Sequence, residues 1–331
     1  MLVNIANAQA ELGCDVTIVI INDKVDQALQ QTISPKVKAY FLKRKDGSRS
    51  ILPFIKLNWL LFLGGPDVIH CHLDSVIKII AKPFYKRCFY TRHAVSSQKL
   101  PPKERLLKFK KIFAISNAVK SFLWENFQLE SIVVENGIVP GNFEKRQYRA
   151  VTSSDVIRMV TVGRLLTEVK GQDLIIKAMT YLSKYNICLD IIGDGPDKGA
   201  LQSLIVERSL SDRVSLLGPR SQNELHNILK DYDIFVMASY TEGFGLTVAE
   251  AMAAKLPVVV SNIEGPKEIV AGGKYGHLFK VGDAEDCARA IKYVVANYDT
   301  QYSIDEAYRH VQENYSVKTT AANYIKLYQQ I

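Results

Sequence analysis

The sequence contains no apolar run of the roughly 18 residues that a membrane-spanning helix needs. The nearest candidate, residues 51–63, is interrupted by Pro53, Lys56 and Asn58, which predicts an amphipathic surface or loop helix. A secretory signal is not expected either, because residues 1–12 are amphipathic and lack a basic amino-terminal region. These absences favour a soluble globular protein.

Cysteine is scarce, with five residues at positions 14, 71, 88, 188 and 287. Their odd number and scattered positions argue against a disulfide framework, and their spacing does not fit a zinc site. We expect buried free thiols in a reducing cytoplasm. Internal repeats and low-complexity tracts, which would indicate a solenoid or a disordered region, are also missing.

The chain does have an excess of positive charge, with 42 Lys/Arg against 34 Asp/Glu. The excess lies in residues 1–150, which hold 23 Lys/Arg and 12 Asp/Glu. This imbalance predicts an anionic partner for the first half, such as a phosphorylated lipid, an acidic glycan or a membrane surface. Nucleic acid is the rival partner, but the sequence has no nucleic-acid-binding motif. An ordinary solvated surface with extra lysines remains the other alternative.

Short apolar runs rich in β-branched residues alternate with helical patterns along the chain, which predicts right-handed βαβ units and parallel sheets. In the first half, strands are expected at 16–21, 37–41, 68–72, 88–91, 111–115 and 132–134. In the second half, they are expected at 157–162, 188–192, 213–217, 234–238, 258–260 and 277–279. Helices are expected at 2–12, 173–182, 198–209, 222–230, 247–254 and 286–297. The fold class predicted is α/β, with two Rossmann-like doubly wound domains that face a cleft.

The pattern divides into a domain at 1–149, a second domain at 150–314 and a final helix at 315–331. We expect this helix to pack across the domain junction, because one face of it carries an apolar stripe. The stripe consists of Val317, Ala321, Tyr324, Ile325, Tyr328 and Ile331.

The first domain begins with a helix, although a doubly wound domain normally opens with a central strand and a glycine turn. Removing a central strand would leave unpaired backbone on both neighbouring strands. The expectation from the sequence is therefore that a strand and a glycine loop precede Met1, or that the chain is an aberrant fragment.

Residues 239–257 carry the strongest functional signal. A buried strand is followed by a turn with Gly243 and Gly245 and then by an Ala-rich helix, with Glu242 and Glu250 on either side of the turn. This arrangement directs backbone N–H groups and the positive end of a helix at an anion such as a diphosphate. The two carboxylates are suited to sugar or ribose hydroxyls.

A second cluster of candidates follows the first strand of the second domain, where Gly163 and Arg164 precede Lys170 at the start of a helix. Both cations are expected to point at the same anion as that helix. Each taken alone is more simply a surface charge.

Two further strand ends carry glycine turns. Residues 193–199 resemble a dinucleotide fingerprint, but the third glycine comes one residue late and Pro196 occupies the turn. We therefore interpret Gly193 and Gly195 as a tight turn that lets a ligand or backbone approach, and not as a nicotinamide site. Arg220 follows Gly218 and Pro219 at the next strand end, near a position suited to main-chain contacts with a base.

Histidines end two expected strands of the first domain. Strand alternation puts His70 and His72 on one face, and His93 ends the following strand. A two-histidine metal site is one interpretation, but a third ligand at a fitting spacing is missing. Hydrogen-bonded histidines at the strand ends are the interpretation that we favour.

Together these motifs resemble the retaining, nucleotide-sugar-dependent glycosyltransferases of family four, which have the GT-B fold. The resemblance covers nearly the whole chain and is most specific at residues 239–253. Other residues that carry it are 162–165, 170–171, 193–196, 257–259, 70–72, 115–119 and 135–138. Lys255 departs from the family, which usually has glycine there, and we expect little harm because a lysine suits a helix C-terminus.

The resemblance implies a role for each candidate residue. Arg164 and Lys170 would bind the donor diphosphate, Glu242 would contact the transferred sugar, and His93 would lie near the reacting carbon. Glu250 would bind the ribose hydroxyls. The remaining donor-binding positions implied are Gly163, Gly193, Gly195, Arg220, Gly243, Phe244, Gly245, Leu246 and Thr247. No metal ion and no cofactor are expected.

The sequence therefore predicts transfer of a sugar from a nucleoside diphosphate to a glycan or lipid-linked acceptor, in surface polysaccharide biosynthesis. The enzyme would be cytoplasmic and peripheral to the inner face of an anionic membrane, which its basic first domain would contact. The alternatives are a non-catalytic or inactive nucleotide-sugar-binding fragment and a GT-B-like epimerase.

Overall fold

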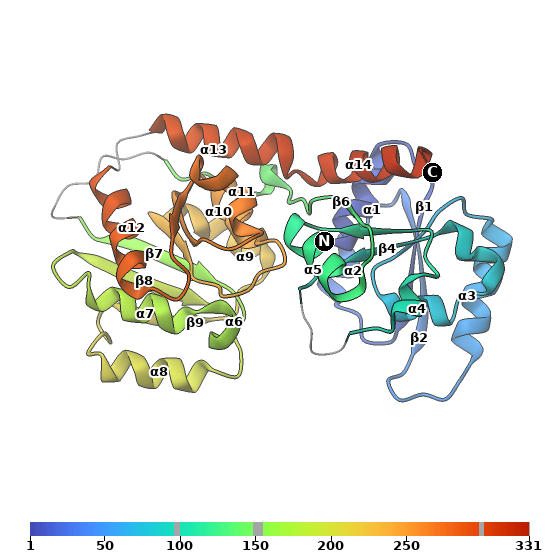
Figure 1. The fold of residues 1–331 in the computed structure, drawn as a ribbon, viewed down its shortest axis with the longest axis horizontal. Helices are drawn as coiled ribbons and strands as arrows, with labels where there is room; N and C mark the ends of the chain where they lie inside the picture. Colours follow the sequence, from blue (N-terminus) through green and yellow to red (C-terminus); the bar gives the residue numbers. More distant parts are fainter. Residues whose placement is uncertain (96–99, 148–154, 298–300, 331) are drawn as a thin grey trace. The chain divides into compact units, whose positions relative to one another are not determined.

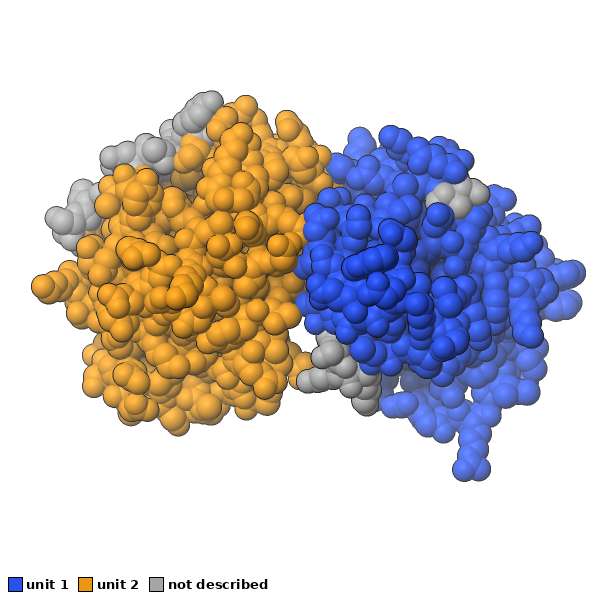
Figure 2. Space-filling view, viewed as in Figure 1, with its two compact units in different colours: residues 1–137, 317–331 blue, residues 138–316 orange. Residues whose placement is uncertain are grey.

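The computed structural model describes residues 1–95, 100–147, 155–297 and 301–330 (Figure 1). The chain divides into two compact units, one of Met1–Gly137 with Val317–Ile331 and one of Ile138–Ser316 (Figure 2). They are called unit 1 and unit 2. The domain boundary predicted between residues 149 and 150 lies outside the described residues, as does Ile331 of the predicted stripe.

Unit 2 is built on one six-stranded parallel sheet in the order β12-β11-β10-β7-β8-β9. Its strands are β7 (Ile157–Val162), β8 (Ile187–Ile192), β9 (Val214–Gly218), β10 (Ile234–Met237), β11 (Val258–Ser261) and β12 (His277–Phe279). Its helices are α6 (Thr167–Lys170), α7 (Gln172–Thr180), α8 (Lys198–Glu207), α9 (Gln222–Ile228), α10 (Leu246–Ala253), α11 (Pro266–Ile269), α12 (Ala284–Ala296) and α13 (Gln301–Asn314). The six strands expected from the sequence are confirmed.

The middle of this sheet is covered on both faces. All four residues of β10 and all four of β11 are buried, as expected for central strands of a doubly wound sheet. Helices α7 and α12 contact each other, and their apolar sides pack on the same core as β8 (Figure 1). This rigid sheet fixes the strand ends from which the predicted donor residues extend.

Unit 1 contains two parallel sheets, β1-β2 and β3-β4-β5-β6. Its strands are β1 (Val16–Asn22), β2 (Val37–Arg44), β3 (Ile69–Cys71), β4 (Cys88–Arg92), β5 (Lys111–Ala114) and β6 (Ile132–Val133). Its α-helices are α1 (Leu2–Glu11), α2 (Gln27–Gln31), α3 (Leu52–Gly64), α4 (Lys103–Leu106), α5 (Asn117–Phe127) and α14 (Val317–Gln329). Short 3-10 helices cover Asp74–Lys78 and Lys82–Arg87.

Helix α1 packs against both sheets of unit 1. Its Val3 and Ala6 contact the core of β1 and β2, whereas Ile5 packs with Phe89 and Phe113 of the second sheet. Helix α14 adds Tyr324 to this second core and lies against α1 (Figure 1). The end of the chain therefore completes the unit in which the chain begins.

Helix α3 is present where the sequence predicts it, but it is not amphipathic. Leu57 and Leu61 are buried, while Trp59, Phe62 and Leu63 are exposed, so apolar side chains lie on both sides of the helix. The prediction rested on Pro53, Lys56 and Asn58 interrupting the apolar run, and the two polar residues among them are too few to form a polar face. No helix in the described part of the chain is long and apolar enough to cross a membrane.

Candidate functional site

Strands β7 and β10 are neighbours in the unit 2 sheet although two other strands separate them in sequence. The sheet order reverses between them, and in doubly wound sheets ligands bind outside the carboxyl ends of the strands at such a point. Arg164 and Lys170 follow β7, and Glu242 follows β10. The strand order therefore brings the two strongest sequence signals to one edge of one sheet.

The ends of β7, β8 and β9 are held together by backbone contacts through glycine. Gly163 N–H donates to Ile192 O at 3.0 Å, and Gly193 N–H donates to Gly218 O at 3.0 Å. A Cβ atom on Gly193 would lie 1.8 Å from Gly163 O, and one on Gly195 would lie 2.2 Å from Leu165 O. Both glycines are thus required for packing of the loops, whatever they do with a ligand.

A third glycine holds Lys170 beside β10. Gly171 lies between α6 and α7 with a φ of 62°, and a Cβ atom there would lie 2.1 Å from Ala238 O. The N–H of Tyr240 also donates to Val169 O at 2.8 Å. These contacts allow Lys170 Nζ to form an ion pair with Glu242 Oε2, the two side chains being 28% and 17% exposed. Water and a ligand therefore have access to both.

The backbone of Arg164 is hydrogen-bonded at the carboxyl end of the sheet, and its side chain lies at the surface. Its carbonyl oxygen accepts a hydrogen bond from Gln172 Nε2 at 2.8 Å, which ties the loop after β7 to the start of α7. Its side chain is exposed. Arg220 is exposed too, and its Nη1 donates to the carbonyl of the adjacent Pro219 at 3.2 Å. The structure therefore brings Lys170 and Glu242 into direct contact, whereas both guanidinium groups lie at the surface.

The turn that follows Glu242 presents backbone and not side chains. Phe244 is buried and packs edge-on against Tyr315, with ring centroids 5.6 Å apart. Gly245 precedes α10 with a φ of 103°, a conformation that favours glycine. The first turn of α10 begins with Leu246 and Thr247, whose N–H groups have no partner within the helix. An anion at this helix N-terminus would meet free donors and the positive end of the helix.

Glu250 lies in the last turn of α10 and is 9% exposed. Burial raises the pKa of its carboxyl from an ordinary 4.5 to about 7, and a hydrogen bond from Gln222 opposes part of this rise. Gln222 Nε2 donates to Glu250 Oε1 at 3.2 Å from the start of α9. Sequence reasoning missed Gln222, because a glutamine at a helix start carries no motif and only the folded sheet brings α9 to α10.

His93 belongs to unit 1, where it follows β4 in a group of three histidines. His72 Nδ1 and His93 Nε2 share a hydrogen bond at 2.9 Å. His70 is hydrogen-bonded to Thr91 Oγ1 at 2.6 Å and to Tyr328 Oη at 2.7 Å. Burial lowers the pKa of His72 to about 3 and that of His93 to about 4, so both rings are neutral at physiological pH.

These contacts occupy ring nitrogens of all three histidines, which is the hydrogen-bonded arrangement that we favoured for His70 and His72. Within residues 1–95, 100–147, 155–297 and 301–330, no group of three or more His, Cys, Asp or Glu side chains is arranged to hold a metal ion.

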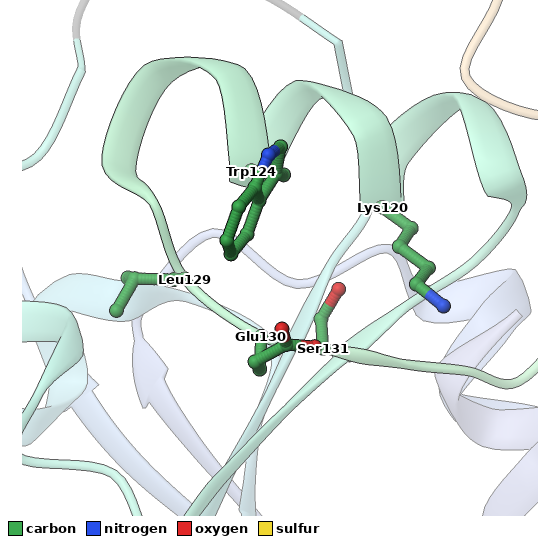
Figure 3. Close-up of a pocket in the computed structure, with 5 residues that line it drawn as sticks. All are labelled: Lys120, Trp124, Leu129, Glu130 and Ser131. Carbon is green, nitrogen blue, oxygen red and sulfur yellow. The ribbon is translucent and has the colours of Figure 1, made fainter.

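Unit 1 also has a cavity of about 270 Å³ between α5 and the segment that leads into β6. Figure 3 shows Lys120 and Trp124 extending from α5 over Leu129, Glu130 and Ser131. It contains none of the residues predicted to bind a donor.

The family described as "Glycosyl transferases group 1" matches residues 144–311, and "Glycosyltransferase Family 4" matches residues 1–141. An uncharacterized glycosyltransferase of Methanocaldococcus jannaschii is 25% identical over 221 residues, which are 67% of this chain and 60% of that protein. The lipopolysaccharide core biosynthesis glycosyltransferase LpsE of Rhizobium meliloti is 34% identical over 146 residues, which are 44% of this chain and 42% of LpsE. The chain thus spans less than two thirds of the length of either relative.

Among solved structures, Anabaena HepE in complex with UDP and glucose superposes with a TM-score of 0.78 at 19% sequence identity, covering 100% of this chain and 95% of HepE. This similarity confirms the predicted fold class, an α/β fold with parallel sheets that matches GT-B structures with two Rossmann-like domains. Since one family match spans residues 144–311 of the 331 and a second covers residues 1–141, the chain belongs to the group 1 glycosyltransferase family.

Proposed function

We propose that this protein is a retaining glycosyltransferase that moves a sugar from a nucleoside diphosphate to a glycan or lipid-linked acceptor. The observation that carries the proposal is the Lys170–Glu242 ion pair, which lies at the point of sheet reversal beside the glycine turn and α10. A cation and the N–H groups of a helix N-terminus suit a diphosphate, and a carboxylate suits the hydroxyls of a sugar. HepE, which has the same fold, binds UDP and glucose, and this supports a nucleotide-sugar donor.

The chemistry follows from the charge that develops as the diphosphate leaves. Loss of a diphosphate from an oxocarbenium-like sugar carbon is accelerated by positive groups fixed around the leaving oxygen. Lys170, Arg164 and the N–H groups at the start of α10 supply that charge, so we propose that neither a metal ion nor another cofactor is needed. Glu242 then contacts the sugar hydroxyls and Glu250 the ribose hydroxyls. His93, neutral because its pKa is lowered by burial, contacts the donor sugar near the reacting carbon.

The acceptor side of the proposal rests on charge and on one relative. LpsE acts in lipopolysaccharide core biosynthesis, and surface polysaccharide biosynthesis is the corresponding process that we propose here. Residues 1–150 hold 23 Lys/Arg against 12 Asp/Glu, which suits an acceptor at an anionic membrane surface. The protein would then be peripheral to the inner face of that membrane.

Turnover of nucleotide sugars tests the proposal directly. The protein is incubated with UDP, GDP, ADP and CDP sugars while calorimetry measures binding and nucleotide release measures turnover, with and without a chelator. We expect one nucleotide class to bind and turn over, with no loss on chelation. Lys170→Ala is expected to lower kcat by about 100-fold, since it removes a charge that acts on the leaving group.

Glu242→Gln is expected to lower kcat/KM by about 100-fold through loss of the ion pair and the sugar contact. Glu207→Gln, at an exposed position on α8, is the matched control and should retain full activity. Turnover that survives Glu242→Gln would remove that residue from the site. Binding without turnover in the unmodified protein would instead support the alternative of a non-catalytic nucleotide-sugar-binding protein.

A further inference from the structure

Helix α3 of unit 1 exposes several large apolar side chains, which is unusual for a surface that contacts only water. Trp59 is 61% exposed, Phe62 73% and Leu52 70%, and Ile51 and Ile55 are also exposed. Soluble monomers rarely expose large contiguous apolar patches, and such patches mark interaction sites.

Helix α3 is fixed to the rest of unit 1 by buried side chains and hydrogen bonds. Leu57 and Leu61 are buried, and Asn58 Nδ2 donates to Ile79 O at 2.7 Å. Asn58 Oδ1 accepts from Ala81 N–H at 2.7 Å, and the helix contacts β2 (Figure 1). Its last turn is closed by Gly65, whose N–H donates to Leu61 O at 3.1 Å. The apolar surface is thus a fixed feature of unit 1.

The same face is hollowed. An open groove of about 560 Å³ runs along α3 and is lined almost wholly by apolar side chains. Its lining residues are Ile51, Phe54, Ile55, Asn58, Trp59 and Phe62. The guanidinium of Arg44 lies over the Phe54 ring at 5.1 Å from its centroid, so a cation borders the groove directly.

Positive charge surrounds this helix. Residues 43–67 contain five Lys/Arg and two acids, Asp46 and Asp67, and residues 78–87 contain four Lys/Arg and no acid. The second segment lies beside α3, because Ile79 and Ala81 are the partners of Asn58. All but one of these cations are exposed: Lys43, Lys45, Arg49, Lys56, Lys78, Lys82, Lys86 and Arg87. Exposed Trp, Phe and Leu side chains bordered by Lys and Arg complement an anionic bilayer, because the membrane interface favours Trp and the anionic surface attracts the cations.

The charge also decides between a bilayer and a second copy of the chain. A two-fold dimer places the same patch on both partners, so these cations would face one another. An anionic lipid surface complements them. We propose that α3, with residues 43–51 and 78–87, is a membrane-docking surface whose apolar side chains insert among anionic lipids. The proposal rests on the membrane association suggested above and assigns it to one helix.

Vesicle binding by the full chain tests the assignment. We expect the protein to sediment with vesicles of phosphatidylcholine and phosphatidylglycerol, at least about tenfold more than with phosphatidylcholine alone, and to be released by salt. Equal binding to both vesicles, or binding to neither, would overturn the proposal.

The two tryptophans of the chain give a matched pair of reporters. Trp124→Phe leaves Trp59 as the reporter on α3, and Trp59→Phe leaves Trp124, which is 49% exposed on α5. With anionic vesicles, emission from Trp59 should shift to shorter wavelength and be quenched by brominated lipid, while Trp124 emission should not change. The opposite pattern would place the docking surface elsewhere on the chain.

Phe62→Glu is expected to reduce vesicle binding about tenfold, because it places a charge in the inserted face. The control is Val206→Glu, at a residue 61% exposed on α8 of unit 2, which should bind as the unmodified protein does. A dimer seen by light scattering that Phe62→Glu dissociates, without vesicle binding, would show that a second copy covers α3. Nucleotide binding and turnover are measured on the same variants, so that failure of the proposed enzyme and failure of the docking surface give different results.

Discussion

Glu250 is the residue at which pH should act on donor binding. Its pKa of about 7 leaves the buried carboxyl partly protonated at neutral pH. The charged form is the better acceptor for two ribose hydroxyls, so donor binding should favour loss of the proton. Affinity for a nucleotide sugar is therefore expected to fall about tenfold per pH unit below 7 and to level off above it. Calorimetry from acid to alkaline pH in buffers of different ionisation enthalpy measures both the affinity and the proton released.

Glu250→Gln is the control for this prediction, because glutamine cannot titrate. Its affinity should be lower than that of the unmodified protein at pH 8 and should not change with pH. The free energy of unfolding should change with pH in the sense opposite to donor affinity. Because the pKa of Glu250 is higher in the folded protein than in the unfolded chain, this carboxyl contributes stability that is fully present below pH 4.5 and is lost as pH rises through 7. The variant should gain up to about 3 kcal/mol over the unmodified protein at pH 8 and nothing at pH 4. If the nucleotide-sugar affinity of the unmodified protein did not change with pH, the role assigned to Glu250 would be contradicted.

The site residues differ in how far the sequence could predict them. Glu242 and Lys170 carry signals because a charged residue beside a glycine turn at a strand end has few structural reasons to be there. The structure places these two in contact, 72 residues apart in sequence. Gln222 carries no such signal, and the pKa of Glu250 depends on burial by neighbouring elements. Contacts between helices and desolvation both arise only in the folded unit.

Among the elements of unit 2, α10 ends in an unusual way that makes a second prediction. Lys255 adopts a φ of 62°, in the left-handed region where glycine is unstrained. Leu256 N–H donates to Ala251 O at 3.0 Å, and Lys255 N–H donates to Met252 O at 3.1 Å, which together form a Schellman motif. Lys255 Nζ pairs with Asp305 Oδ1 of α13 at 2.6 Å. The lysine thus combines backbone strain with a side-chain contact.

Replacing Lys255 separates these two effects. Lys255→Ala keeps the strain and loses the ion pair, so unfolding free energy should fall by about 1 kcal/mol. Lys255→Gly loses the pair but relieves strain of about 1 kcal/mol and should be close to the unmodified protein. Chemical denaturation measures both, and Asp305→Ala reports the ion pair alone. A glycine variant less stable than the alanine variant would show that this position carries no left-handed strain.

The elements were predictable where burial dictates composition. Strands β10 and β11 are buried on both faces, so their sequences are continuous apolar runs that sequence alone identifies. Helix α13 was missed, since few of its residues are apolar and, of the side chains described at 303–314, the buried apolar ones are Ala307 and Val311. For α3 the prediction of an amphipathic helix was wrong for another reason, because its surface residues are as apolar as its buried ones.

On the scale of the whole chain, unit 1 is built from two separate stretches of sequence, and no local sequence pattern indicates that they fold together. The stripe on α14 predicts that the helix packs across the domain junction, and the structure places its Tyr324 in the core around Phe89 and Phe113 of unit 1. The sequence alone does show that the excess of positive charge lies in residues 1–150. The structure divides the strands of unit 1 into two sheets, β1-β2 and β3-β4-β5-β6, and α1 packs on both.

This topology predicts that damage to the last helix affects the first unit. Tyr324 of α14 is fully buried, and its hydroxyl is hydrogen-bonded to Thr91 at 2.9 Å. Tyr324→Ala should therefore lower the stability of unit 1 by about 3–5 kcal/mol, whereas Tyr324→Phe, which keeps the ring, should cost about 1 kcal/mol. Hydrogen exchange should accelerate in β4 and β5 of the alanine variant, while the amides of β10 and nucleotide binding by unit 2 remain unchanged. Equal acceleration in both units would mean that they unfold as one cooperative body, and the last helix would then stabilise the donor site as well as the unit on which it packs.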